Sequence, residues 1–170
     1  VLLINMFSEK IEEYINLKEK YEKYLFSNNF EQAYAVIQYI EENICVSLWS
    51  IKQTFLLKEC IGGLQLNKET LASYSKKARN NIIIQIILNF YSIQAEKNVS
   101  YINYQENIKK YLEKFEKEQN RIYQYFDYKL NLSYETVFEN AIIPIQIDSQ
   151  LSIIDTYETF IDMIQIISYT

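Results

Sequence analysis

A chain of 170 residues, 49% hydrophobic and 23% charged, is long enough to bury a continuous core and too apolar to stay disordered. It has only two glycines and one proline, so it lacks the turn residues of β-sandwiches, barrels and doubly wound sheets, and the composition predicts an all-α fold. The absence of histidine excludes His-based acid–base catalysis, Ser–His–Asp and Cys–His nucleophilic sites and His-containing metal centres from this sequence.

Two helices are predicted at the start of the chain. The first runs from about residue 3 to residue 26, and the second carries apolar side chains at steps of three and four over residues 30–44. Asn28 and Asn29 lie between them and predict a turn, because Asn tolerates left-handed backbone angles. We therefore expect an antiparallel helical hairpin.

The junction of these two helices resembles that of a tetratricopeptide-type repeat. The resemblance rests on the run Asn28-Asn29-Phe30-Glu31-Gln32-Ala33, with Tyr24 upstream and Ile37 downstream. In that family an aromatic and a small residue at this spacing let the two helices pack closely. The resemblance covers residues 14–43, with Asn28 in place of the usual Gly, and no second copy follows at an offset of 34 residues. It implies a helical hairpin, and it does not imply a repeat array.

The middle of the chain is predicted to hold three helices. Ser47 is expected to cap the first, which the pair Gly62-Gly63 ends. Asn67 is expected to cap the second, which leads into the third with at most a kink at Asn80-Asn81. Cys45 and Cys60 are then expected in one helix, reduced and about 22 Å apart at 1.5 Å per residue.

The segment Ile82–Tyr91, with eight apolar residues in ten, is expected to be the central element, covered on nearly every side. A buried β-strand is the alternative, because Ile is β-branched. The lack of Gly or Pro over residues 80–98 and the helical patterns on both sides favour a helix. We therefore predict an irregular helical bundle or α-solenoid-like stack of seven to eight helices around a central Ile-rich helix, forming a single domain over residues 1–170.

The last third of the chain is predicted to contain a long helix from Ser100 to about residue 130 and a short helix that Ser133 caps. Pro144 must lie beyond that short helix, so residues 142–147 are expected to form an extended linker or a strand-like edge. A final helix is predicted over about residues 149–169. Its inward face is expected to consist of Ile153, Tyr157, Phe160, Ile161, Ile164 and Ile167. Its outer side is expected to carry Asp155, Glu158, Asp162 and Gln165.

Charge is distributed unevenly along the chain, with a net charge of −4 over residues 1–50, +5 over 51–121 and −6 over 122–170. One interpretation is that the basic middle packs near the acidic ends within the fold. The other is that Lys76, Lys77 and Arg79 form a patch that binds an acidic partner, although cations at a helix C-terminus also complement its dipole. A pI near 4.9 makes nucleic acid a poor ligand for this chain.

The composition and motifs predict a non-enzymatic helical module that binds a protein or a peptide, with no catalytic residue, cofactor or metal. The alternative is an accessory helical segment of a nucleic-acid-processing or defence-type assembly whose catalytic residues lie elsewhere. No run approaches the roughly 20 apolar residues of a membrane span and no signal peptide is recognisable, so we expect a cytoplasmic protein that makes no membrane contact. The sequence begins at Val1, as a fragment of a longer protein would.

Overall fold

The computed structural model of the chain describes residues 5–115, 120–131 and 142–169, and this part is all-helical, without a strand. The all-α prediction is therefore confirmed. The helices that the structure describes are α2 (Ser8–Phe26), α3 (Phe30–Asn43), α4 (Leu48–Lys77), α5 (Ile82–Ala95), α6 (Tyr101–Leu112), α7 (Arg121–Leu130), α8 (Ile142–Leu151) and α9 (Ile153–Tyr169).

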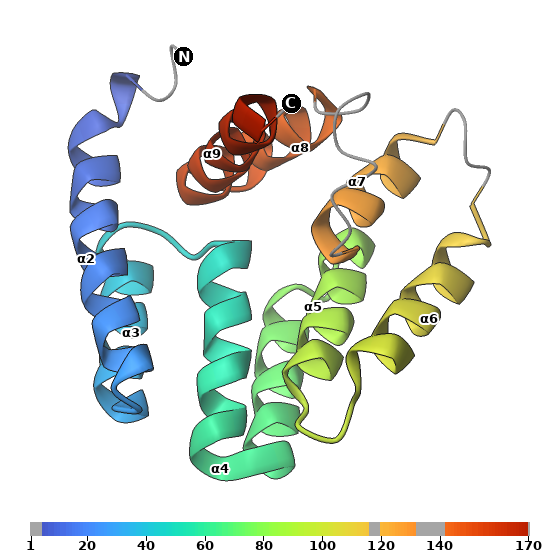
Figure 1. Cartoon of the computed structure of the whole chain (residues 1–170), viewed down its shortest axis with the longest axis horizontal. Helices are drawn as coiled ribbons and strands as arrows, with labels where there is room; N and C mark the ends of the chain where they lie inside the picture. The colour runs from blue at the N-terminus through green and yellow to red at the C-terminus, as the bar shows by residue number, and fades with distance from the viewer. Residues whose placement is uncertain (1–4, 116–119, 132–141, 170) are drawn as a thin grey trace.

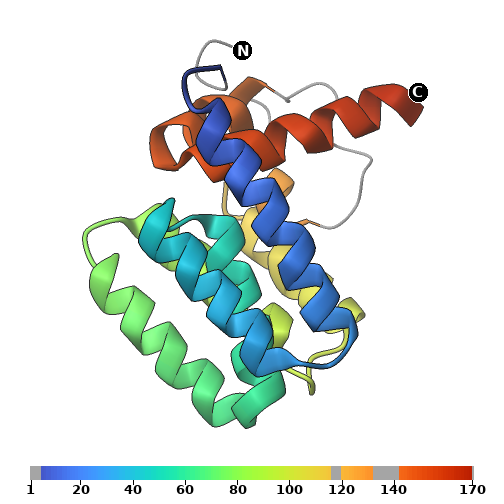
Figure 2. The same ribbon diagram turned by 90° about the vertical axis from the view of Figure 1, so that its left-hand side faces the viewer.

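Helices α2 to α5 stand next to one another in chain order, α6 and α7 both pack on α5 and on each other, and α8 and α9 close the stack (Figure 1). Helix α8 packs on α7, while α9 packs on both α4 and α2. Figure 2 shows α9 crossing α2 at one end of the stack. The C-terminal pair thus connects α7, at one end of the stack, with α4 and α2 toward the other end.

The apolar core consists of two clusters. The larger one surrounds α5 and contains fully buried Phe55, Ile87 and Phe126, from α4, α5 and α7. The smaller one fills the α2–α3 hairpin, where Ala33 and Ile37 are completely buried. Each cluster is extended by neighbouring helices, as expected when amphipathic helices bury one stripe each.

The first hairpin forms as predicted, because Asn28 adopts a left-handed conformation with φ of 56° between α2 and α3. Helix α2 begins at Ser8, and residue 3, where the first helix was expected to start, lies outside the described residues. The close approach of the two helices fits the complete burial of Ala33.

Helix α4 starts as predicted but continues through its glycine pair. Ser47 and Ser50 form a capping box at its N-terminus. Gly63 bends the helix with φ of 66° and ψ of −159°, and the second arm follows at once. The prediction that Asn67 caps a new helix was wrong: Asn67 is already inside the second arm and is fully buried. Cys45 precedes α4, so it does not share a helix with Cys60, and both cysteines are free.

The Ile-rich segment is a helix, which rules out the strand alternative, but only part of it is covered. A turn over residues 78–81 separates it from α4, and Asn81 caps it by accepting a hydrogen bond from the backbone of Ile84. Ile87 and Leu88 are fully buried, whereas Ile82 is 72% exposed. The expectation of burial on nearly every side therefore holds for the C-terminal half of α5 alone.

The predicted helix over residues 100–130 is two helices. Ser100 caps α6 as expected, but α6 ends at Leu112, and Asn120 caps α7 with its side-chain oxygen. Ser133 lies outside the described residues. Residues 142–147 are helical and belong to α8, because Pro144 lies in the first turn, where a helix does not need its N–H group.

Helix α9 presents a different face from the one its apolar pattern predicts. Ile154, Asp155 and Thr159 are buried, whereas Ile164 is 48% exposed. Asp155 is turned inward because it accepts hydrogen bonds from the backbone amides of Leu48 (2.8 Å) and Trp49 (3.0 Å) at the start of α4. A carboxylate at a helix N-terminus is favourable, and this tertiary contact outweighs the apolar period.

Candidate functional site

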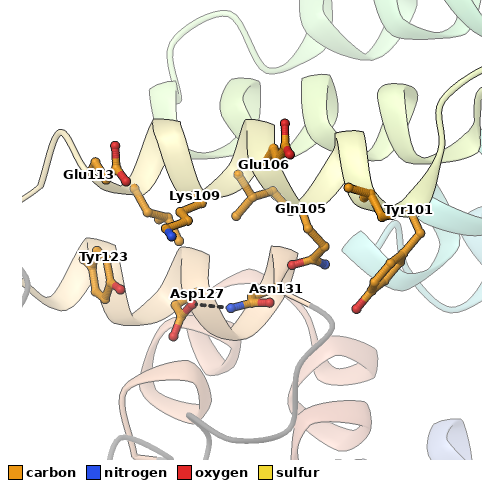
Figure 3. A pocket seen from close by; sticks show the side chains of 11 residues that line it. Tyr101, Gln105, Glu106, Lys109, Glu113, Tyr123, Asp127 and Asn131 are labelled. Atoms are coloured by element: carbon orange, nitrogen blue, oxygen red, sulfur yellow. Dashed lines mark hydrogen bonds between the residues drawn. The ribbon is translucent and has the colours of Figure 1, made fainter.

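A groove of about 480 Å³ lies between α6 and α7 (Figure 3). The two helices run side by side in opposite directions, and polar and aromatic side chains project from both. The groove is lined by Tyr101, Ile102, Gln105, Glu106, Ile108, Lys109, Leu112, Glu113, Tyr123, Asp127 and Asn131. Its volume lies in the range of small-molecule and peptide sites.

The groove has an apolar floor and an exposed apolar rim. Ile108 and Leu112 are almost completely buried and join the larger core cluster, so the floor is anchored to the rest of the fold. Tyr101 and Ile102, in the first turn of α6, are 59% and 67% exposed. Large apolar side chains exposed next to a concave surface are typical of contact sites.

One polar group in the groove has no partner among the described residues. The side-chain nitrogen Nε2 of Gln105 is buried and makes no hydrogen bond to any of them. Figure 3 shows the Gln105 side chain directed from α6 toward α7, near Asn131. On the α7 side, Asn131 donates to Oδ1 of Asp127 over 2.9 Å. A buried amide without a partner is uncommon, and it calls for an explanation.

Charge around the groove is predominantly negative. Glu106, Glu113 and Asp127 contribute three carboxylates, against one ammonium from Lys109. Asp127 is 8% exposed, and together with burial its charge raises the pKa of Tyr123. Among the described residues neither Glu106 nor Glu113 forms an ion pair, so both remain available to a ligand.

A second polar cluster, centred on Asp148 of α8, is structural in geometry. Asp148 is fully buried and accepts hydrogen bonds from Tyr125 (2.7 Å) and Thr159 while it pairs with Lys129 (2.7 Å). Its oxygens are thus occupied by the protein itself. In the part of the chain that the structure describes, no three His, Cys, Asp or Glu residues are arranged to hold a metal.

Lys52 lies near this cluster and is the described lysine whose environment most resembles that of a reactive one. Burial lowers its pKa, the positive charge of Lys129 lowers it further, and its ammonium lies 5.6 Å from the ring centre of Tyr91. A lysine of lowered pKa suits nucleophilic chemistry only where a substrate can reach it. Lys52 does not line the groove, so the two features do not combine into a site.

The residues predicted to bind a partner lie elsewhere. Lys76 and Lys77 occupy the last turn of α4, Arg79 follows in the turn before α5, and all three are exposed. The ammonium of Lys77 lies over the ring of Tyr74 at 5.5 Å. None of the three lines the groove. Their position at a helix C-terminus fits the dipole interpretation, and a role in binding stays a prediction.

Sequence reasoning missed the groove because it joined α6 and α7 into one helix. The available signal was Asn120, a residue type that favours N-caps, which stands after a run of charged and polar residues. Helix α4 of the basic middle packs on α3 and on α9, which belong to the acidic ends. None of the three ion pairs among the described residues joins the basic middle to an acidic end.

Comparison with models of protein families, with curated proteins and with solved structures finds no match for this chain. The resemblance to a tetratricopeptide-type hairpin over residues 14–43 therefore stays a prediction. None of the described helices is long and apolar enough to span a membrane.

Proposed function

We propose that this chain is a non-enzymatic helical module of the cytoplasm that binds a segment of another protein in the groove between α6 and α7. The observation that carries the proposal is the buried Nε2 atom of Gln105, a residue that lines the groove; this atom has no hydrogen-bond partner among the described residues. A buried polar atom without a partner costs about 1–3 kcal/mol, which a ligand that supplies the missing hydrogen bond recovers.

The exposed rim supports the same function. Tyr101 and Ile102 offer apolar area next to the groove, and Tyr123 adds an aromatic ring on the α7 side (Figure 3). Interfaces are enriched in tyrosine because its ring combines a large apolar area with a polar end at a small loss of side-chain entropy. The buried Asp148 cluster joins α8 to α7 and α9 through hydrogen bonds and an ion pair. We regard this as a structural role and expect no catalytic turnover.

The test compares two substitutions that differ only in place. Ile102 is 67% exposed and Ile82 is 72% exposed, and each lies in the first turn of a helix. Ile102→Glu alters the groove rim, while Ile82→Glu is the matched control. Peptides are selected from a random twelve-residue display library on the wild-type protein, and their dissociation constants are measured by fluorescence anisotropy.

We expect Ile102→Glu to raise the dissociation constants of the selected peptides at least about tenfold, because the variant loses one well-placed apolar contact and gains a charge that binding must desolvate. Ile82→Glu should leave their affinity unchanged. The proposal fails if no peptide is enriched over an unrelated helical protein, or if both substitutions weaken binding equally. The alternative role, as an accessory segment of a nucleic-acid-processing or defence-type assembly, stays a prediction.

A further inference from the structure

We infer that the α6/α7 groove takes an extended peptide segment that carries a lysine or arginine and places a backbone carbonyl on Nε2 of Gln105. This inference rests on the proposed function and specifies the shape, charge and main hydrogen bond of the ligand. Three features of the groove lead to it: its length, the buried amide of Gln105 and the balance of charge.

The length of the groove suits a short extended segment. Helix α6 has 12 residues and is therefore about 18 Å long at 1.5 Å per residue. Five extended residues cover about the same length at about 3.3 Å each. Their cross-section is smaller than that of a helix, whose diameter is about 10 Å with its side chains.

The amide of Gln105 specifies what the segment must supply. Its Nε2 atom is buried and has no acceptor in the part of the chain that the structure describes, and the side chain is directed into the space between the helices (Figure 3). An extended peptide exposes a backbone carbonyl at every residue, whereas the carbonyls inside a helix are already bonded. Only an extended ligand therefore offers an unused backbone acceptor at any position along the groove.

Charge selects a cationic segment. Asp127 lies on the α7 side and Lys109 reaches toward it from α6, while Glu106 and Glu113 form the outer rim of α6 (Figure 3). The three carboxylates exceed the single ammonium, and exposed charges act on a ligand within about one Debye length, about 8 Å at physiological ionic strength. A lysine or arginine in the peptide is attracted there, and an acidic residue is repelled.

The experiment uses N-acetylated, C-amidated seven-residue peptides in a positional-scanning library, tested on the whole chain. A preference for Lys or Arg at one position is expected, and Glu106→Gln combined with Glu113→Gln should weaken the selected peptide. Gln105→Leu is the decisive variant. It removes an unpartnered buried amide, so it should raise Tm by about 2–4 °C. It should also lower the affinity for the peptide about three- to tenfold.

The outcomes separate this inference from the function on which it rests. Higher Tm with weaker binding supports it, because a purely structural role for Gln105 would change Tm alone. The inference fails, while the proposed function stands, if Gln105→Leu binds the peptide as well or better, if acidic residues are selected, or if a lactam-bridged helical form of the peptide binds more tightly. Absence of binding by any library peptide overturns both.

Discussion

Replacing Asp148 by asparagine tests whether a buried ion pair holds α8 and α9 on the stack. Asp148 is completely buried, and the side chain of Lys129, 2.7 Å away, is only 11% exposed. Asparagine has nearly the same volume, so the substitution creates no cavity and chiefly removes the charge. The ammonium of Lys129 is then buried without a counterion, and Thr159 and Tyr125 lose part of their shared acceptor.

Removal of one partner of a buried pair costs about 3–5 kcal/mol, a large share of the 5–15 kcal/mol that stabilises a typical domain. The matched control is Glu96→Gln, which removes the charge from the pair with Lys68. That pair is also short, at 2.5 Å, but the Lys68 side chain is 45% exposed. Exposed pairs contribute about 0–1 kcal/mol, so the two substitutions should differ by at least about 2 kcal/mol.

Urea unfolding at 25 °C, followed by the fluorescence of Trp49, the sole tryptophan, measures both variants. Addition of Lys129→Met to Asp148→Asn should recover part of the lost stability, because no buried ammonium then stays unpaired. Equal losses for Asp148→Asn and Glu96→Gln, with unchanged m-values, would refute the reasoning. The C-terminal helices would then be held by apolar contacts alone.

Three further substitutions or titrations follow from the described geometry. Asn67→Asp should cost about 3 kcal/mol in urea unfolding at pH 7, because a second carboxylate replaces the amide that donates to buried Glu59 over 3.1 Å. Gly63→Ala should lower stability by about 1–3 kcal/mol in calorimetry, because φ of 66° with ψ of −159° is a glycine conformation; an unchanged Tm would show that the bend adopts other angles. Burial and a neighbouring carboxylate raise the pKa of Tyr14 and of Tyr125, so their contribution to stability is intact below pH 10 and falls above it, by about 1.4 kcal/mol per pH unit for each phenol. Absorbance at 295 nm should then show these tyrosines ionising only as far-UV circular dichroism is lost, and ordinary titration near pH 10 would contradict their burial.

Sequence predicted the features that depend on residues a few positions apart. The left-handed turn at Asn28, the cap at Ser47 and the cap at Ser100 each follow from a side chain and the backbone within four residues of it. The larger apolar stripes likewise placed α3 and the second half of α5 in the core. Such local chemistry acts in the same way whatever the remainder of the fold does.

Features that depend on distant partners were not predictable. The apolar period of α9 places Asp155 outside, but the unpaired amides at the start of α4 bind its carboxylate, and burial then raises its pKa. The polarity of Asn67 suggested a cap, whereas its amide satisfies Glu59 and Ser92 across two helices. The groove was missed for a related reason, since it exists only because α6 and α7 fold back on each other.

The distribution of unsatisfied polar atoms distinguishes the helix pair α6 and α7 from the other described helices. Asn67, Asp148 and Asp155 are buried and fully engaged. The three buried side-chain atoms without a partner among the described residues are Tyr104 Oη, Gln105 Nε2 and Gln124 Oε1, and all belong to α6 or α7. Each unpartnered atom costs about 1–3 kcal/mol, so among the described helices α6 and α7 lose the most stability to unsatisfied polar atoms. Where local stability is low, ligand binding produces the largest gain in protection from amide hydrogen exchange. A bound peptide should therefore slow amide hydrogen exchange in α6 and α7 far more than in the hairpin of α2 and α3, and uniform protection across the chain would assign the ligand to another surface.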